Sequence, residues 1–256
     1  MRLNFHVQGD GYPLIILHGL LGASDNWRAM SKRLAAHWLV YSLDLRNHGA
    51  SPHSSVMNYA VMADDLSEFL ANEKIAQAHL LGHSMGGKVA MRLAAAKPEA
   101  VAKLAIVDIA PRAYAPTDRP LLAALGALDL TRCQSYGEAE QSLATAIPDR
   151  ALRQFLVKNL ARGADQSLHW RVGLGEITAN YDAINQAVTS ARPIANPTCF
   201  IRAGRSNFIT DTDIAAIGPM FTNAEVATIA DAGHWVHIDA AEEFYRVVTS
   251  FLLGET

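Results

Sequence analysis

The chain has 256 residues, half of them hydrophobic, and a formal net charge of −3 at pH 7. This is enough for one α/β domain, or for a domain that carries an insertion. The sequence has no basic block or acidic tail, which argues against a nucleic-acid-binding protein and against a disordered charged segment. The start MRLNFHVQGDG lacks the apolar segment of a signal peptide, and no apolar run is long enough to span a bilayer.

Two cysteines, Cys133 and Cys199, lie far apart and outside any C-x-x-C pair. This arrangement predicts two free thiols in a reducing compartment. Together with the composition, it predicts a soluble cytoplasmic protein that has no membrane or nucleic-acid partner.

Short apolar runs alternate with helical patterns through the first 110 residues. Strands are expected in LNFHVQ, PLIILHG, WLVYSLDL, AHLLGHS and LAIVDIAP. Helices are expected in DNWRAMSKRLAAH, NYAVMADDLSEFLANEK and MGGKVAMRLAAAKP. Alternating strands and helices are typical of βαβ units, so we predict an α/β fold with a mostly parallel central sheet flanked by helices.

The pattern changes after residue 110. Residues 111–190 have a helical composition and no convincing strand, and the alternation then resumes in PTCFIRAG and EVATIAD before a last helix in AAEEFYRVVTSFLLG. We therefore predict an α/β core formed by residues 1–110 and 191–256, and a helical cap formed by residues 111–190. An insertion at the carboxyl end of a strand lies over the crevice in which open α/β sheets bind ligands.

A G-x-S-x-G pentapeptide, Gly82-His83-Ser84-Met85-Gly86, stands between an apolar strand and a helix. This placement predicts a nucleophile elbow that exposes Ser84 on a strained turn, although an ordinary glycine-rich turn is the alternative. The backbone N–H of Met85 starts the helix, and that of Leu20 lies in the HGLLG loop after an earlier strand. These two amides are predicted to form the oxyanion hole.

Ten histidines are candidates for the base that would activate this serine. His234 follows the last predicted strand, which fits the chain order of nucleophile, acid and base in hydrolases of this kind. We predict that His234 is the base. His237 is expected at a helix start or behind the base, His18 is expected to hold its loop, and His83 is expected to point away from Ser84.

The acid that orients the base has two candidate positions. The loop after FIRAG, where a carboxylate is usual, holds Asn207, while the later Asp211 and Asp213 are typical helix caps. Asp108 ends the apolar strand LAIVDIAP, where a carboxylate is costly unless it is paired. We favour Asp108 over Asp211 as the acid, and the alternative role of Asp108 is to anchor the loop that enters the cap.

The motifs HGLLGASDNW, LDLRNHGASP, GHSMGGKVAM, VDIAP and DAGHWVH together resemble the α/β hydrolases, in particular the YbfF-type esterases and their mitochondrial relatives. The resemblance covers nearly the whole chain and is weakest in the cap. It implies a catalytic triad of Ser84, Asp108 and His234, and the same two oxyanion amides. It also implies that Arg46 and His48, in the RNHG stretch, order the loop beside the site.

The motifs predict a serine esterase without cofactor or metal. The resemblance implies that its substrates are carboxylic esters of short to medium acyl chains, and acyl-CoA thioesters are a further candidate because the same chemistry opens them. Two alternatives are a carbon–carbon bond hydrolase or lactonase on the same triad, and a ligand-binding protein with weak turnover. The His and Cys spacings do not match metal motifs.

The sequence leaves open whether the chain is a monomer or a homodimer. Most apolar cap residues are expected in the core of the cap, with a few on the acyl pocket, among Leu121, Leu122, Phe155, Leu156 and Trp170.

Overall fold

The structure of the chain is a computed structural model that describes residues 1–254. Its centre is a seven-stranded sheet in the order β1-β3-β2-β4-β5-β8-β9. Strand β1 pairs antiparallel with β3, and the other pairs are parallel. The predicted, mostly parallel sheet is therefore confirmed. The bounds are β1 Phe5–Gln8, β2 Pro13–Leu17, β3 Leu39–Leu43, β4 Ala78–His83, β5 Val101–Val107, β8 Thr198–Ala203 and β9 Ala224–Ile229.

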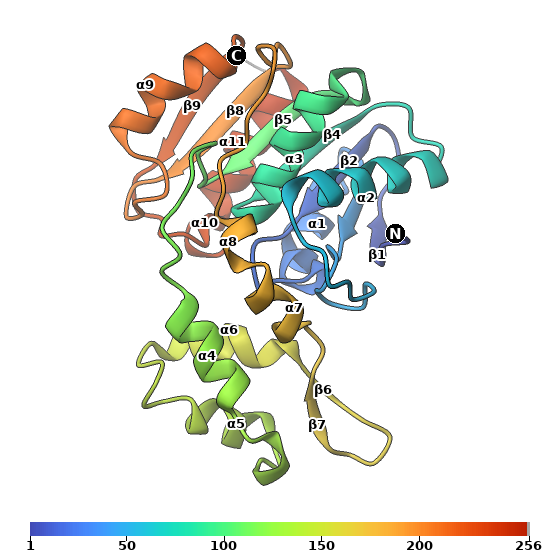
Figure 1. Cartoon of the computed structure of the whole chain (residues 1–256). Helices are drawn as coiled ribbons and strands as arrows, with labels where there is room; N and C mark the ends of the chain where they lie inside the picture. Colours follow the sequence, from blue (N-terminus) through green and yellow to red (C-terminus); the bar gives the residue numbers. More distant parts are fainter. Residues whose placement is uncertain (255–256) are drawn as a thin grey trace.

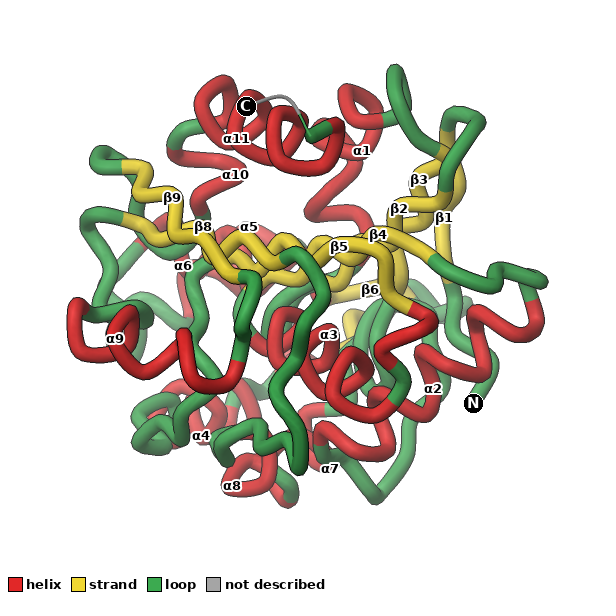
Figure 2. The backbone as a smooth tube through the Cα atoms, turned by 90° about the horizontal axis from the view of Figure 1, so that it is seen from above, coloured by secondary structure: helices red, strands yellow, loops and turns green. Residues whose placement is uncertain are grey.

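Helices cover both faces of this sheet (Figure 2). One face carries α1 (Arg28–Leu34), α10 (Val236–Asp239) and α11 (Ala241–Leu253), and the other carries α2 (Tyr59–Asn72), α3 (Met85–Ala96) and α9 (Asp211–Met220). Short 3₁₀ helices precede α1 at Ser24–Trp27 and follow α3 at Pro98–Ala100. Successive residues of β2 alternate between the two apolar cores, with Leu14 and Ile16 in one and Ile15 and Leu17 in the other. This is the period-two alternation of a strand that is buried on both faces.

The chain between β5 and β8 forms a separate layer beside the sheet (Figure 1), and residues 111–190 of it are called the cap. A two-stranded hairpin in this layer corrects the expectation that the cap contains no strand. Each of its strands has only three residues, which is too short to show a period-two pattern in the sequence. The elements are α4 Arg119–Ala127, α5 Tyr136–Ser142, α6 Arg150–Leu156, β6 Leu160–Arg162, β7 Leu168–Trp170, α7 Leu174–Ala179 and α8 Tyr181–Ile184, with 3₁₀ turns at Leu130–Arg132 and Val157–Asn159.

Two further features of the chain are the character of its helices and the state of its two cysteines. No helix within residues 1–254 combines the length and the apolar character that crossing a membrane requires. Cys133 and Cys199 are both buried, and both are free thiols, as the sequence predicted.

The strand order reverses between β2 and β4, which are neighbours in the sheet. The chain leaves β2 toward β3 on one side, and it leaves β4 toward β5 on the other. The two loops at the carboxyl ends of these strands therefore diverge and open a crevice, which is where open α/β sheets bind ligands. The loop at residues 18–22 and the turn at Ser84 lie at this point of the sheet.

Asp44 lies directly after β3, and its carboxylate ties three segments together. It accepts hydrogen bonds from the Ser24 N–H at 2.7 Å, the Ala50 N–H at 2.9 Å and the Asn4 side-chain amide at 2.8 Å. Burial alone would raise the pKa of Asp44, but the hydrogen bonds from Ala50 and Ser24 outweigh burial and hold this pKa below its ordinary value. The ionised carboxylate thus stabilises the carboxyl edge of the sheet.

We expect Asp44→Asn to lower the free energy of unfolding by about 1–3 kcal/mol, because it replaces a charged acceptor of backbone N–H groups with a neutral amide. The stabilisation in the wild type is present above the ordinary carboxyl pKa and is lost as the pH falls through the lowered pKa of the folded state. Urea denaturation at pH 7 measures the loss. The control is Asp64→Asn on the exposed side of α2, and equal stabilities of the two variants would contradict the prediction.

Candidate active site

Ser84 lies at the sharp turn between β4 and α3, with φ 51° and ψ −119°. A Cβ atom at Gly82 would lie 2.5 Å from the Gly86 carbonyl oxygen, and one at Gly86 would lie 2.4 Å from the Leu17 carbonyl oxygen. Both distances are too short for a real side chain, so glycine is required where α3 approaches the sheet. A positive φ in a residue other than glycine costs on the order of 1–3 kcal/mol. Packing around the two glycines holds Ser84 in this conformation.

The side chains of His234 and Asp108 meet, although they follow different strands, β9 and β5. The His234 Nδ1–H donates to Asp108 Oδ2 at 2.8 Å. Asp108 is fully buried, and its Oδ1 accepts from the Ala203 N–H at 3.2 Å. The Phe208 ring stacks on the imidazole with 4.1 Å between ring centroids. A carboxylate that accepts from Nδ1–H fixes the tautomer and leaves Nε2 able to accept a proton.

The other candidate acids lie elsewhere. Asp211 begins α9 on the exposed surface, where it accepts from the Arg202 guanidinium at 2.6 Å. Asp213 forms a capping box with Thr210 at the start of the same helix. Asp213 thus takes part in capping the helix, as the sequence indicated, whereas the cap residue itself is Thr210 and Asp211 follows it as the first residue of the helix. The structure therefore brings Asp108, and not Asp211, to the imidazole.

The loop after β2 lies directly against the elbow. A Cβ atom at Gly19 would lie 3.2 Å from the Ser84 Cβ. His18 holds this loop, because its Nδ1–H donates to the Gly19 carbonyl at 2.8 Å and its Nε2 accepts from the Leu45 N–H at 3.0 Å. Burial lowers the pKa of His18, which keeps the ring neutral and able to accept. This is the structural role that the sequence predicted for His18.

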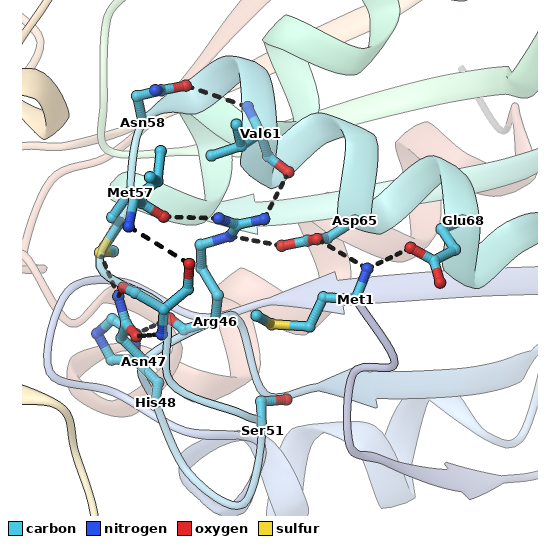
Figure 3. A network of polar contacts seen from close by, with 12 residues as sticks. Met1, Arg46, Asn47, His48, Ser51, Met57, Asn58, Val61, Asp65 and Glu68 are labelled. Carbon is cyan, nitrogen blue, oxygen red and sulfur yellow. Dashed lines mark hydrogen bonds and ion pairs between the residues drawn. The ribbon is translucent and has the colours of Figure 1, made fainter. Parts of the chain in front are cut away.

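A second buried histidine, His48, holds the next part of this loop, and Figure 3 shows it together with Arg46 and Asp65. His48 Nε2 accepts from the Leu21 N–H at 3.1 Å, and its Nδ1–H donates to the Arg46 carbonyl at 2.9 Å. Arg46 is fixed in turn by Asp65, whose carboxylate accepts from Nε at 2.6 Å. Burial, followed by the charge of His18, lowers the pKa of His48 to about 3. The neutral ring therefore keeps the Leu21 amide occupied near neutral pH.

His83 is the residue whose role sequence reasoning missed. It is buried, and its Nε2–H donates to the backbone carbonyl of His234 at 2.8 Å. Burial lowers the pKa of His83 well below its ordinary value, and the charges of His234 and His237 lower it further. The neutral ring therefore fixes the backbone that carries the predicted base. A neighbour of the nucleophile in the sequence gives no signal of this contact, because the partner lies 151 positions away.

A cavity of about 700 Å³ lies between the cap and the carboxyl edge of the sheet. Ser84, His234, Leu20 and Met85 all line it. The N–H of Met85 is the first of α3, and such an amide has no acceptor within its own helix. Of the five apolar cap residues singled out in the sequence, three line the cavity and two lie away from it; the three are Leu121, Phe155 and Leu156, and the two are Leu122 and Trp170.

The polar groups of the cavity include a hydroxyl and an imidazole that is paired with a carboxylate. Within residues 1–254, no three side chains of His, Cys, Asp or Glu gather as they would around a metal ion. What the cavity does hold is a hydroxyl on a strained turn and an imidazole paired with a buried carboxylate. An alcohol nucleophile beside such a base is the arrangement that nucleophilic catalysis uses.

The sequence profile of a family described as alpha/beta hydrolase fold matches residues 12–241. The chain belongs to the α/β hydrolase family. Esterase YbfF of Escherichia coli is 30% identical to this α/β hydrolase over 258 residues, which cover 98% of the chain and 99% of the relative. The sn-1-specific diacylglycerol lipase ABHD11 of Mus musculus is 33% identical over 247 residues, which cover 93% of the chain and 80% of the relative.

A solved structure described as a marine microorganism esterase superposes on this α/β hydrolase with a TM-score of 0.95. The two sequences are 38% identical, and the match covers 97% of this chain and 98% of the other. The comparisons confirm the predicted α/β hydrolase fold, the resemblance to the YbfF-type esterases and the prediction of an ester-hydrolysing enzyme.

We expect this α/β hydrolase to lose stability as the pH falls below about 6.5, the ordinary histidine pKa. Burial lowers the pKa of five of its histidines, which therefore bind protons more readily in the unfolded chain than in the folded one. Stability is then greatest above the ordinary pKa and falls toward the lowered values. The five are His18, His48, His79, His83 and His237.

Urea denaturation between pH 8 and pH 5 measures this dependence. His79 lies away from the cavity, and His79→Leu should reduce the slope of stability against pH because it removes one of the five groups. The matched control is Gln8→Leu, which adds the same leucine without removing a titratable group and should leave the slope unchanged. A stability that stays constant over this range would contradict the expectation.

Proposed function

We propose that the chain is a serine esterase in which Ser84 is the nucleophile, His234 the general base and Asp108 the acid that orients the base. The observation that carries this proposal is the 2.8 Å hydrogen bond from His234 to the fully buried Asp108, on the cavity that Ser84 also lines. The carboxylate would stabilise the imidazolium that forms during the reaction. The similarity to esterases supports an ester as the substrate.

In the first step Ser84 Oγ adds to the ester carbonyl carbon while its proton passes to His234 Nε2. The tetrahedral intermediate then expels the alcohol oxygen, which takes this proton, and an acyl-enzyme remains. Water next adds to the acyl carbon with His234 as the base, and the carboxylic acid leaves as Ser84 regains its proton. No hydrogen bond between Ser84 and His234 occurs among those of residues 1–254, and contacts of this kind tighten when substrate binds.

The oxyanion of each tetrahedral intermediate is proposed to accept from the Leu20 and Met85 amides. Leu20 belongs to the loop that lies against Ser84, and His48 already occupies the next amide, that of Leu21. Met85 opens α3, whose aligned peptide dipoles favour negative charge at that end. One donor of an oxyanion hole typically contributes about 2.7–4 kcal/mol to transition-state stabilisation.

The proposed substrates are carboxylic esters of short to medium acyl chains, and thioesters of the same acyl groups react by the same steps. Support comes from the apolar cap side chains on the cavity, which suit an acyl chain. The two free, buried thiols, Cys133 and Cys199, support our proposal that the enzyme works in the reducing cytoplasm.

We expect Ser84→Ala and Asp108→Asn each to lower kcat for p-nitrophenyl butyrate by on the order of 10⁴-fold, because members of a triad act as a unit. Steady-state hydrolysis of p-nitrophenyl acetate and butyrate measures the effect, and circular dichroism checks the fold. Asp211→Asn is the control and should stay near the wild-type rate. A collapse in Asp211→Asn with activity retained in Asp108→Asn would reassign the acid.

We expect Phe155→Ala to raise kcat/KM for p-nitrophenyl octanoate relative to the acetate by roughly tenfold. Phe155 lines the cavity, and removing its ring makes room there for a longer acyl chain. The acetate reaction should change little, since its acyl group is too short to reach the cap. Tyr136→Ala, on the exposed surface of α5, is the control in the cap. An unchanged ratio of the two rates would place the acyl chain elsewhere.

A further inference from the structure

Lys88 is a lysine buried next to the proposed nucleophile. It lies on α3, and its backbone N–H donates to the Ser84 carbonyl at 3.2 Å, which closes the first turn of the helix. Residues four positions apart share one face of a helix, about one turn from each other. The residue is only 1% exposed, and it lines the same cavity as Ser84. A cation so deeply buried is uncommon unless an anion pairs with it.

The ammonium group of Lys88 has only uncharged partners. It donates to the backbone carbonyls of Arg112 and Gln186, both at 2.7 Å. It also lies 4.7 Å from the Tyr114 ring centroid and 5.4 Å from that of Tyr59. An ammonium has three N–H donors, and the two hydrogen bonds use two of them. In the part of the chain that the structure describes, the third donor has no hydrogen-bond acceptor, and the positive charge has no counter-ion. None of the ion pairs found within residues 1–254 includes Lys88.

The groups that face this ammonium do not supply a negative charge near neutral pH. Burial raises the pKa of both Tyr59 and Tyr114, the latter to about 12, so their hydroxyls stay protonated. The Arg112 guanidinium is positive and pairs with Asp213 at 2.8 Å. Burial, followed by the Arg112 charge, lowers the pKa of Lys88 to about 7. A bound anion would restore the full charge of the ammonium.

We propose that Lys88 binds a carboxylate that the substrate carries a few carbons from the ester bond. The preferred substrates of the site are then esters with a free carboxylate, either half-esters of dicarboxylic acids or esters of hydroxy acids. The substrate carboxylate supplies the missing counter-ion, and the ester carbonyl lies one helical turn away at Ser84. This inference rests on the proposed esterase function and narrows its substrate class.

The position of Lys88 also has a purely structural explanation that the test must separate. Arg112 and Gln186 lie near the two ends of the cap, so the two hydrogen bonds join both ends to the helix that carries Ser84. If Lys88 only holds the cap, its loss lowers the rates of charged and neutral esters alike. If Lys88 binds the substrate carboxylate, its loss lowers the rates of charged esters selectively.

The experiment compares kcat/KM for two matched pairs of esters in the wild type and in Lys88→Met. The first pair carries the carboxylate on the acyl part, monomethyl adipate against methyl hexanoate. The second pair carries it on the alcohol part, 4-acetoxybutyrate against butyl acetate. We expect the charged-to-neutral ratio of at least one pair to fall about tenfold or more in Lys88→Met, as for the loss of a charge-assisted hydrogen bond. The pair that responds identifies the part of the substrate that Lys88 contacts.

Lys32→Met, on the exposed surface of α1, removes the same charge from the far face of the sheet and should leave both ratios unchanged. Ratios in Lys88→Met that equal those of the wild type would overturn the inference while leaving the esterase proposal intact. Wild-type enzyme that hydrolyses none of the four esters would overturn both.

A second measurement needs no variant and therefore does not depend on the folding of Lys88→Met. In the wild type, the charged-to-neutral ratio should fall as the pH rises from 6.5 to 9, because Lys88 loses its proton in this range. Both esters of a pair use the same nucleophile and base, so the titration of these groups cancels in the ratio. The substrate carboxylates stay ionised throughout. A ratio that is constant with pH would overturn the proposed contact.

Discussion

The first turn of helix α3 approaches the sheet so closely that no side chain fits between them there, and the site depends on this contact. Glycine at positions 82 and 86 removes the Cβ atoms that would collide with the backbone of the elbow and of β2. The turn that results holds Ser84 at the carboxyl edge of the sheet and brings Met85, the first residue of α3, to the cavity. It also places Lys88 on the same helix, one turn further along. Nucleophile, proposed oxyanion donor and buried cation thus share one rigid element.

The parallel sheet brings the other residues of the site together. Because parallel strands end at the same edge, residues that follow different strands meet there even when they are distant in the sequence. Asp108 and His234 are 126 positions apart and still form a hydrogen bond. The sequence allowed this pair to be anticipated, since the apolar flanks of Asp108 indicated a buried carboxylate that needs a partner. The glycines around Ser84 likewise identified the elbow, because few other turns require small residues at both positions.

Other parts of the molecule could not be predicted from the sequence for physical reasons. The β6–β7 hairpin is too short to produce a periodic pattern. His83 acts through a contact with the backbone of a distant loop, and a backbone contact leaves no trace in the residue types. A lysine in a helical pattern is ordinarily a surface residue, and Lys88 is buried only because both ends of the cap fold over it. In each case tertiary contacts, rather than local preference, decide the outcome.

Leu21, Ser84 and Asp108 all adopt positive φ angles, of 57°, 51° and 47°, although none of them is glycine. Such backbone costs on the order of 1–3 kcal/mol at each position, and a whole domain retains only about 5–15 kcal/mol of stability. Selection for heat resistance alone would therefore enrich replacements at these positions that relax the backbone, and such replacements at Ser84 and Asp108 would remove the proposed nucleophile and acid. A directed-evolution library built on this chain must be sorted by turnover as well as by survival at high temperature.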